Sequence, residues 1–187
     1  MALTATLYHW QLGLSDTDRG VYETLDLRLA RHPSESMRYL LTRTLAYCLS
    51  YEEGISFSRG GLSATEEPPV AVHDPTGRLL AWIDVGAPSA ERLHKAAKAA
   101  AQVALYTGSD LLALRREARS RTIHRLAEIT LWRIEPRFLD EAEAALESLG
   151  RRSAELELLR SEGQIYLTLD GRTIAGQVTS APLSEAL

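Results

Sequence analysis

The sequence predicts a mixed α/β fold, in which antiparallel and parallel strands form a sheet flanked by helices. Several segments alternate apolar and polar residues, as strands do, and others repeat apolar residues at helical spacing. A helical segment that follows a hairpin and precedes another strand is typical of a crossover between parallel strands. The length of 187 residues suits one domain over residues 1–187.

The expected elements follow from these two periodicities and from turn residues between them. The expected strands are 4–14, 21–29, 55–59, 67–73, 78–86, 103–106, 111–115, 128–134 and a closing meander over 154–178. The expected helices are 34–49, 89–101, 116–125 and 136–149. The residues after the meander are expected to fray.

Turn and cap residues place the first boundaries. Asp16 and Asp18 lie between the first two strands and are interpreted as turn formers rather than metal ligands, because Asp bonds readily to its own backbone. Ser34 is expected to cap the first helix, with Glu35 at the positive end of the helix dipole. Gly60-Gly61 is expected to end the short strand that follows.

Later boundaries have equally clear signals. Asp74-Pro75-Thr76-Gly77 is a turn sequence that predicts a central hairpin. Ser89 is expected to cap the next helix, whose small apolar face suits packing against a sheet. Glu162-Gly163 and Asp170-Gly171 mark the two turns of the closing meander.

Composition excludes several classes of protein. The chain has 45% hydrophobic and 25% charged residues and a formal net charge of −4, which is ordinary for a globular protein and lacks a strongly basic coat. The single cysteine, Cys48, excludes an intrachain disulfide and is expected to be buried. No secretory leader or membrane-spanning stretch is recognised, so a cytoplasmic location without membrane contact is expected.

Two acids of the central hairpin form the candidate chemical site. A two-residue loop centred between Pro75 and Thr76 places Glu67 opposite Asp84. Two such carboxylates lie roughly 4.5–5.5 Å apart at Cβ and repel each other unless a cation lies between them. The pair is therefore a candidate Mg²⁺ site, with Mn²⁺ as a substitute. A bulge would alter this register, and in the alternative interpretation Asp84 caps a turn while Glu67 is solvated.

A helix stripe beside the hairpin offers a cation. Glu91, Lys95, Lys98 and Gln102 recur at steps of three and four residues, so they share one helix face. A lysine there would reach toward Asp84 and stabilise the charge that develops in phosphoryl transfer. The alternative is a surface ion pair between Glu91 and Lys95 on a solvated face.

Residues 115–125 are rich in cationic side chains. This segment predicts contact with a phosphate backbone, or alternatively a solvated helix face. The candidate nucleic-acid-binding residues are Arg115, Arg116, Arg119 and Arg121. The five histidines show no metal-ligand spacing, and the sequence has no phosphate-binding glycine loop or dinucleotide fingerprint.

Several spaced motifs, in order along nearly the whole chain, resemble the YaeQ family. They are Met-Ala-Leu-x-Ala-Thr at the start, 29–35 (Leu-Ala-Arg-His-Pro-Ser-Glu), 57–60 (Phe-Ser-Arg-Gly), 66–68 (Glu-Glu-Pro), 74–77 (Asp-x-Thr-Gly), 82–88 (Trp-Ile-Asp-Val-Gly-x-Pro) and 92–96 (Arg-x-x-Lys-Ala).

The resemblance implies a PD-(D/E)XK, restriction-endonuclease-like core with an N-terminal hairpin and flanking helices. In that superfamily a first acid lies on one hairpin strand and a (D/E)-x-K motif on the next, so Glu67 matches the first acid and Asp84 the second. Gly86 stands where the motif has lysine. The resemblance then implies a lysine from the next helix, Lys95 or Lys98. Two further residues are implied: Gln102 as a helper and Glu35 as an additional acid.

Three functions remain open from the sequence. The first is a Mg²⁺-dependent nuclease that cleaves phosphodiesters, and the second is a catalytically inactive module that binds nucleic acid or a protein. The third is a protein-interaction scaffold without nucleic-acid contact. The sequence leaves the oligomeric state open.

Overall fold

The computed structural model describes residues 5–58 and 66–187. The chain divides into two compact units and passes between them within α1 (Met37–Leu49), β7 (Thr130–Ile134) and β10 (Arg172–Pro182). The described residues of the first unit are 5–41 and 134–178, and those of the second unit are 42–58, 66–133 and 179–187.

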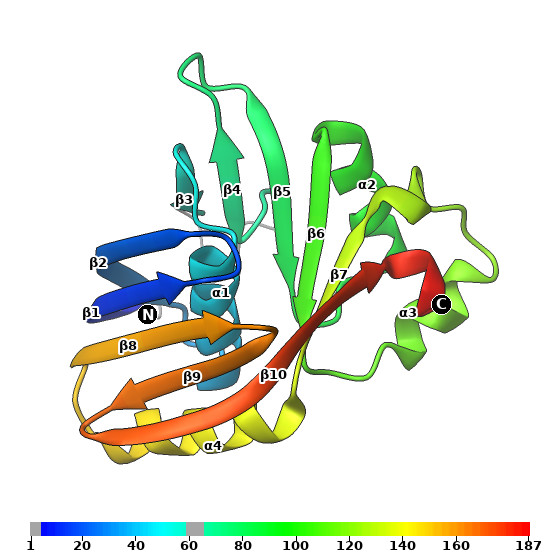
Figure 1. The fold of residues 1–187 in the computed structure, drawn as a ribbon. Coiled ribbons are helices and arrows are strands. Elements are labelled where there is room, and N and C mark those ends of the chain that lie inside the picture. Colours follow the sequence, from blue (N-terminus) through cyan, green and yellow to red (C-terminus); the bar gives the residue numbers. More distant parts are fainter. Residues whose placement is uncertain (1–4, 59–65) are drawn as a thin grey trace. The chain divides into compact units, whose positions relative to one another are not determined.

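The opening hairpin forms one edge of the sheet in the first unit (Figure 1). β1 (Thr6–Asp16) and β2 (Val21–Arg31) pair antiparallel without a break from Thr6 opposite Arg31 to Asp16 opposite Val21. Alternate apolar residues are buried on one face because successive strand side chains point to opposite faces. The predicted hairpin is therefore confirmed.

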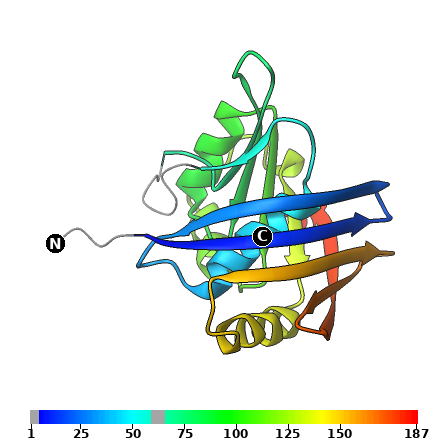
Figure 2. The same ribbon diagram turned by 90° about the vertical axis from the view of Figure 1, so that its left-hand side faces the viewer.

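The predicted closing meander is also confirmed. β8 (Ser153–Ser161), β9 (Gln164–Leu169) and β10 pair antiparallel in sequence, and β8 pairs parallel with β1. The strand order of the first unit is thus β2-β1-β8-β9-β10 (Figures 1 and 2). Each turn holds two residues with positive φ, as the tight turns of hairpins require, which explains Glu162-Gly163 and Asp170-Gly171.

The tip of the first hairpin is tied to the β8–β9 turn. Asp18 accepts hydrogen bonds from the backbone N–H groups of Glu162 at 2.6 Å and Gly163 at 3.1 Å, and these bonds lower the pKa of its carboxyl. Asp16 is fully buried and pairs with Arg160 at 3.3 Å. The two aspartates therefore lie at the predicted turn and, in addition, make contacts with residues far away in sequence.

Helix α4 (Pro136–Ser148) packs against β10, as shown by Gly176, where a Cβ atom would lie 2.4 Å from the Cβ of Phe138. Arg38, at the start of α1, pairs with Asp140 and Glu143 of α4. Ser34 is not the cap of α1, since Ser36 accepts a hydrogen bond from the backbone N–H of Tyr39 at 3.1 Å. The cap of the helix therefore lies two residues later than expected.

In the described residues of the second unit, the strand order is β7-β6-β5-β4-β3. β3 (Ile55–Phe57), β4 (Val70–His73) and β5 (Leu79–Val85) are antiparallel, whereas β5, β6 (Gln102–Thr107) and β7 are parallel. Helix α2 (Ala90–Ala99) connects β5 to β6 and supplies the predicted crossover. The expected end of β3 at Gly60-Gly61 lies outside the described residues.

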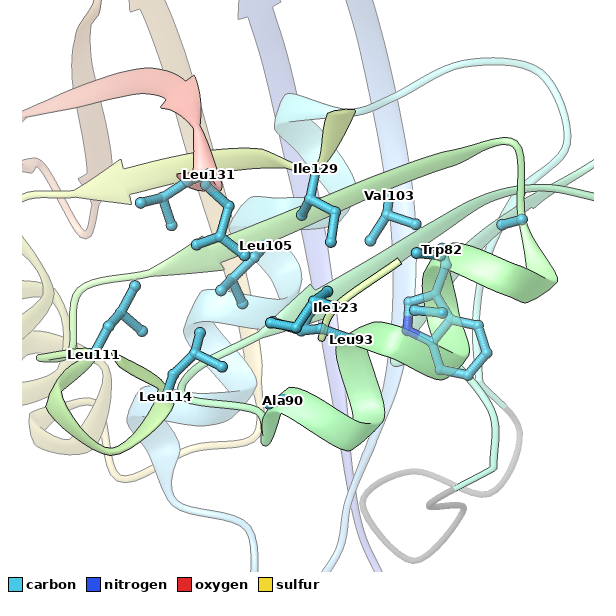
Figure 3. Close-up of a cluster of buried hydrophobic side chains, with 14 residues drawn as sticks. Trp82, Ala90, Leu93, Val103, Leu105, Leu111, Leu114, Ile123, Ile129 and Leu131 are labelled. Carbon is cyan, nitrogen blue, oxygen red and sulfur yellow. The ribbon is translucent and has the colours of Figure 1, made fainter. Parts of the chain in front are cut away.

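A buried hydrophobic cluster joins α2 to the neighbouring strands (Figure 3). Leu93 of α2 and Leu105 of β6 are fully buried in it, as is Leu183 near the C-terminus. Leu183 also donates its backbone N–H to the carbonyl of Ile129 at 2.8 Å. The expected fraying of the last residues is therefore wrong, because β10 and the 3₁₀ turn η3 (Leu183–Glu185) anchor them.

Two expectations for residues 111–125 are wrong. The expected strand at 111–115 is instead the start of helix α3 (Leu112–Ala118). The expected helix at 116–125 ends at Ala118, and turns lead from it to the 3₁₀ turn η2 (Leu126–Glu128). Leu111 and Leu114 are both buried, and this spacing of three residues fits a helix better than a strand.

The predicted mixed α/β class is confirmed, with four α-helices in the described part of the chain. The single-domain expectation stays a prediction. Cys48 is fully buried, as expected, and burial raises the pKa of its thiol. Among residues 5–58 and 66–187, no helix is long and apolar enough to cross a membrane, and the cytoplasmic location stays a prediction.

Candidate functional site

Asp84 lies near the end of β5 and is 2% exposed. Strand β5 pairs with β6 on one side, where Asp84 is opposite Leu105, and with β4 on the other. Gly86 follows with a φ of 80° and donates its N–H to the carbonyl of Tyr106. The end of β5 therefore holds a buried carboxylate, and a buried charge needs a partner.

That partner is Arg92. Its Nε donates to Oδ2 of Asp84 at 2.6 Å, and the indole Nε1–H of Trp82 donates to the same oxygen at 3.2 Å. The other oxygen, Oδ1, accepts the backbone N–H of Val85 at 3.2 Å. Both oxygens of the buried carboxylate thus accept hydrogen bonds, and its charge is balanced by a guanidinium.

Arg92 is held from several sides. It lies in the first turn of α2, where Ser89 caps the helix by accepting the Arg92 N–H at 3.2 Å. Its guanidinium carbon lies 5.4 Å from the ring centroid of Trp82, a cation–π distance. Its Nη2 donates to the backbone carbonyl of Glu67 at 3.0 Å. One guanidinium therefore contacts the Asp84 carboxylate and the Glu67 main chain.

The two predicted acids are neighbours but do not face each other across a ladder. β4 begins at Val70, which pairs with Ile83, so the hairpin register differs by two residues from the expected one. The expected pairing of Glu67 with Asp84 is therefore wrong. A register irregularity between Val72 and His73 alters the pairing near the turn.

The Glu67 side chain takes a different direction from that of Asp84. It is exposed, and its Oε2 accepts a hydrogen bond from the hydroxyl of Ser58 at 3.1 Å. Ser58 in turn donates its backbone N–H to the carbonyl of Pro69. The carboxylate of Glu67 is thus oriented by β3 and by the approach to β4, while the cation beside Asp84 belongs to α2.

The remaining predicted site residues are dispersed. Lys95 pairs with Glu66, Lys98 is exposed on α2, and Gln102 is the exposed first residue of β6. Glu35 lies in the first unit, where it is 2% exposed and accepts the backbone N–H of His32 at 3.1 Å. None of these four side chains has a hydrogen bond to Asp84 among the contacts of the described residues.

The arginine-rich segment runs along α2. Glu117 accepts the backbone N–H of Ala90 at the start of α2, and Arg125 donates to the carbonyls of Ala97 and Ala100 at its end, both at 2.6 Å. Between these points Arg121 pairs with Glu91 at 2.9 Å. The segment therefore lies beside α2 over the length of the helix.

The predicted nucleic-acid-binding arginines have different roles in the structure. Arg115 donates twice to the carbonyl of Ala186, so part of its hydrogen-bonding capacity holds the C-terminal turn. Arg121 is engaged with Glu91 in an exposed pair. Arg116 and Arg119 are exposed and form no ion pair with another side chain in the described residues. Their assignment to nucleic acid stays a prediction.

The geometry shows whether the predicted site residues fit the magnesium ion that the sequence implied. Within residues 5–58 and 66–187, no three His, Cys, Asp or Glu side chains are grouped as ligands for a metal. Asp84 is already balanced by Arg92, and the Glu67 carboxylate is bonded to Ser58. These residues fit a buried ion pair beside an exposed acid, and not two carboxylates that share a divalent ion.

Arg92 is the residue of the candidate site that the sequence interpretation missed. A cation in the first turn of a helix is unfavourable for the helix dipole, so its presence there signals a compensating acid nearby. Asp84 precedes Arg92 by eight residues and is the last residue but one of the strand that leads into the helix. That combination was available in the sequence.

Comparison with known proteins assigns the chain to a family. A family model described as "YaeQ protein" matches residues 1–178. The YaeQ proteins of Escherichia coli strain K12 and Shigella flexneri are each 30% identical over 182 residues, which cover 96% of this chain and 97% of theirs.

Two crystal structures extend the similarity to the fold. The YaeQ protein of Pseudomonas syringae has a TM-score of 0.82 at 28% identity, covering 94% of this chain and 95% of that one. The YaeQ protein of Xanthomonas axonopodis pv. citri has a TM-score of 0.79 at 28% identity, covering 96% of this chain and 100% of that one. The chain belongs to the YaeQ family.

Proposed function

We propose that the second unit is a non-catalytic module that binds the phosphate backbone of nucleic acids. The contact is made by the α2–α3 surface, which consists of Lys98, Arg116, Arg119 and Arg121. The observation that carries the proposal is that Lys98, Arg116 and Arg119 are exposed without an ion-pair partner in the described residues. Cations of this kind are available to phosphate oxygens.

The local charge supports this surface. Residues 90–128 contain eight Lys and Arg and four Asp and Glu, although the whole chain has a net charge of −4. The segment after α3 lies along α2, so its basic residues flank the helix that carries Lys98. A confined basic patch on an acidic protein gives binding that is weak, insensitive to base sequence and strongly dependent on salt.

The state of Asp84 also favours binding without cleavage. Cleavage by a two-carboxylate site requires acids that are free to hold a metal and activate water. The ion pair with Arg92 at 2.6 Å occupies the buried acid. We therefore assign Asp84 and Arg92 to the support of α2, the helix that contributes Lys98 to the α2–α3 surface.

The test compares labelled DNA and RNA oligonucleotides by fluorescence anisotropy over a series of salt concentrations. The variant is Lys98→Gln/Arg116→Gln/Arg119→Gln. Its control is Arg137→Gln/Arg151→Gln/Arg172→Gln, which removes the same charge from the first unit. We expect the first triple variant alone to reduce the slope of log K against log salt by about two to three. Equal behaviour of the two variants, or no binding by the wild type at low salt, contradicts the proposal.

Metal-dependent cleavage of phosphodiesters on a variant PD-(D/E)XK core is a second candidate function. It is favoured by the single guanidinium of Arg92 that contacts both Asp84 and the Glu67 main chain, because this places the two acids matched by the family resemblance close together. Lys95 lies one helical turn beyond Arg92 on the same helix. In this function Glu67 and Asp84 would have to exchange their present partners, Ser58 and Arg92, for Mg²⁺. Lys95 or Lys98 would bind the phosphate, with Gln102 as a further candidate.

Calorimetric titration of Mn²⁺ separates the two functions. The wild type is compared with Glu67→Gln and Asp84→Asn, which preserve the shape of each side chain. Cleavage requires Mn²⁺ binding that both substitutions weaken, together with loss of oligonucleotide breakdown in EDTA. Binding of nucleic acid that is unchanged by EDTA, without breakdown, supports the non-catalytic module.

A further inference from the structure

The exposed face of the first-unit sheet carries side chains in rows that cross the strands. Strands β2, β1 and β8 lie side by side (Figure 2) and β9 follows, so outward-facing residues of paired strands are neighbours. One row holds large side chains beside a serine, in the order Tyr22, Ser15, Leu159 and Tyr166. The next row holds small side chains beside an acid, in the order Thr24, Gly13, Glu157 and Thr168. The second row therefore forms a trough, and the first row forms a bank beside it.

Two hollows, of about 610 Å³ and 510 Å³, lie along the trough. Both are lined by Gly13, Thr24 and Glu157, and all their lining residues belong to the first unit. The bank is open to solvent, since Tyr22 is 63% exposed and Leu159 is 39% exposed. Helix α4 packs against the other face of this sheet. The trough is therefore an accessible groove.

Gly13 is the residue that keeps the trough open. Its φ lies outside the left-handed region that favours glycine, and its pairing with Thr24 and Glu157 has no bulge. A Cβ atom at this position would meet the Cγ of Glu157 at 3.9 Å and the carbonyl oxygen of Leu156 at 4.0 Å, which are ordinary contacts. The fold therefore does not require glycine here. Because glycine inside a strand lowers stability and often marks a place where a ligand or a second backbone approaches closely, Gly13 points to an occupant of the trough.

Acids that line the hollows give the groove a negative charge. Glu23, Glu155 and Glu157 have no ion pair among residues 5–58 and 66–187. A further lining acid, Asp170, already pairs with Arg151. Within the described part of the chain, neither hollow is lined by a lysine, an arginine or a histidine. A positive charge in an occupant therefore complements the trough, and an apolar group complements the bank.

We propose that this groove binds an extended peptide segment of a partner protein, in which a lysine or arginine lies next to an apolar side chain. The cationic side chain pairs with Glu157 in the trough and with Glu155, two residues away on the same face of β8. The apolar side chain packs against Tyr22 and Leu159 of the bank. The span from β2 to β9 covers three strand spacings, roughly 14 Å, which is the length of about four extended residues. The groove thus has room for both kinds of side chain on one short segment.

Fluorescence anisotropy of a labelled peptide of alternating lysine and valine, eight residues long, tests the proposal with the full chain at low salt. Gly13→Leu fills the trough without a change in charge, and the space around its Cβ atom allows the strand to form. Glu155→Gln/Glu157→Gln removes two acids at exposed positions, so this variant is expected to fold even if Gly13→Leu does not. We expect each variant to weaken peptide binding by about tenfold or more.

Two further variants separate the groove from net charge and the bank from the trough. Glu52→Gln/Glu53→Gln removes two exposed acids from the second unit, and its peptide affinity is expected to stay within about twofold of the wild type. Tyr22→Ser removes part of the bank without a change in charge, and we expect it to weaken binding by about threefold or more. Circular dichroism checks the folding of every variant.

Several results would overturn the proposal. They are a wild type that does not bind the peptide, a folded Glu155→Gln/Glu157→Gln protein that binds it normally, and a Glu52→Gln/Glu53→Gln protein that loses as much affinity as the groove variants. Spermidine that binds the groove as tightly as the peptide, with no effect of Tyr22→Ser, assigns the groove to a free polyamine and also overturns the proposal.

Discussion

The ion pair between Asp84 and Arg92 gives the sharpest test of the site. Arg92→Ala removes the cation from a carboxylate that is 2% exposed and leaves its charge buried. Loss of one partner from a buried pair costs about 3–5 kcal/mol. Because the Arg92 side chain is itself 21% exposed, we expect the lower end of this range, about 3 kcal/mol. Urea unfolding at neutral pH, followed by tryptophan fluorescence, measures the change.

The control for this prediction is Arg121→Ala. Arg121 pairs with Glu91 at 2.9 Å, but both side chains are more than half exposed, so less than about 1 kcal/mol is expected. The double variant Asp84→Leu/Arg92→Met removes both charges and is expected to be more stable than Arg92→Ala. An Arg92→Ala protein within about 1 kcal/mol of the wild type refutes the reasoning, because Asp84 would then have another source of stabilisation.

Three further predictions concern the units themselves. Gly176→Ala places a Cβ atom 2.4 Å from Phe138, so we expect a loss of about 1–3 kcal/mol in urea unfolding. Cys48 is fully buried with a raised pKa, so a thiol reagent is expected to react only after unfolding; rapid labelling of the native protein is the contrary result. The pKa of Asp18 is lowered by two backbone N–H groups, so its contribution to stability is present above the usual value of 3.8 and is lost as pH falls through the lower folded value. In Asp18→Asn, the stability measured by thermal unfolding is therefore expected to depend less on pH below pH 3.8 than in the wild type. The same pH dependence in both proteins contradicts this prediction.

Local sequence signals predicted most strands and helices because their physical causes are local. The alternation in β1, β2 and β8 and the Asp170-Gly171 turn need no distant residue to be recognised. The sequence patterns did not predict helix α3, because a short apolar run fits both the strand and the helix periodicity until the burial of its residues is known. The sequence patterns also did not predict that the C-terminal residues are ordered, because the contact between Leu183 and Ile129 joins residues far apart in sequence.

The candidate site was also predicted only in part, because only some of its features follow from local sequence signals. The sequence identified Asp84 as one acid of a candidate site, and the structure places it in a buried ion pair with Arg92. The register that opposed Glu67 to Asp84 was wrong because the turn is longer than the assumed two-residue loop, so that His73 pairs with Leu79 and Val70 with Ile83. In addition, β4 starts only at Val70, after two prolines that supply no ladder hydrogen bond. Choosing Arg92 over Lys95 as the cation required the direction of each side chain from α2, which spacing alone does not give.

The stability of the ion pair also bears on the choice between binding and cleavage. A divalent ion that takes the Asp84 carboxylate from Arg92 must offset the free energy of that pair. If Arg92→Ala costs about 3 kcal/mol, a metal that displaces the guanidinium loses a factor of roughly one hundred in affinity. A weakly coupled pair, in contrast, leaves Asp84 available to a metal at little cost. The unfolding measurement on Arg92→Ala and the Mn²⁺ titration therefore both report on the free energy of the ion pair between Asp84 and Arg92. A large loss of stability in Arg92→Ala together with tight Mn²⁺ binding by the wild type would mean that Arg92 remains in place beside the metal.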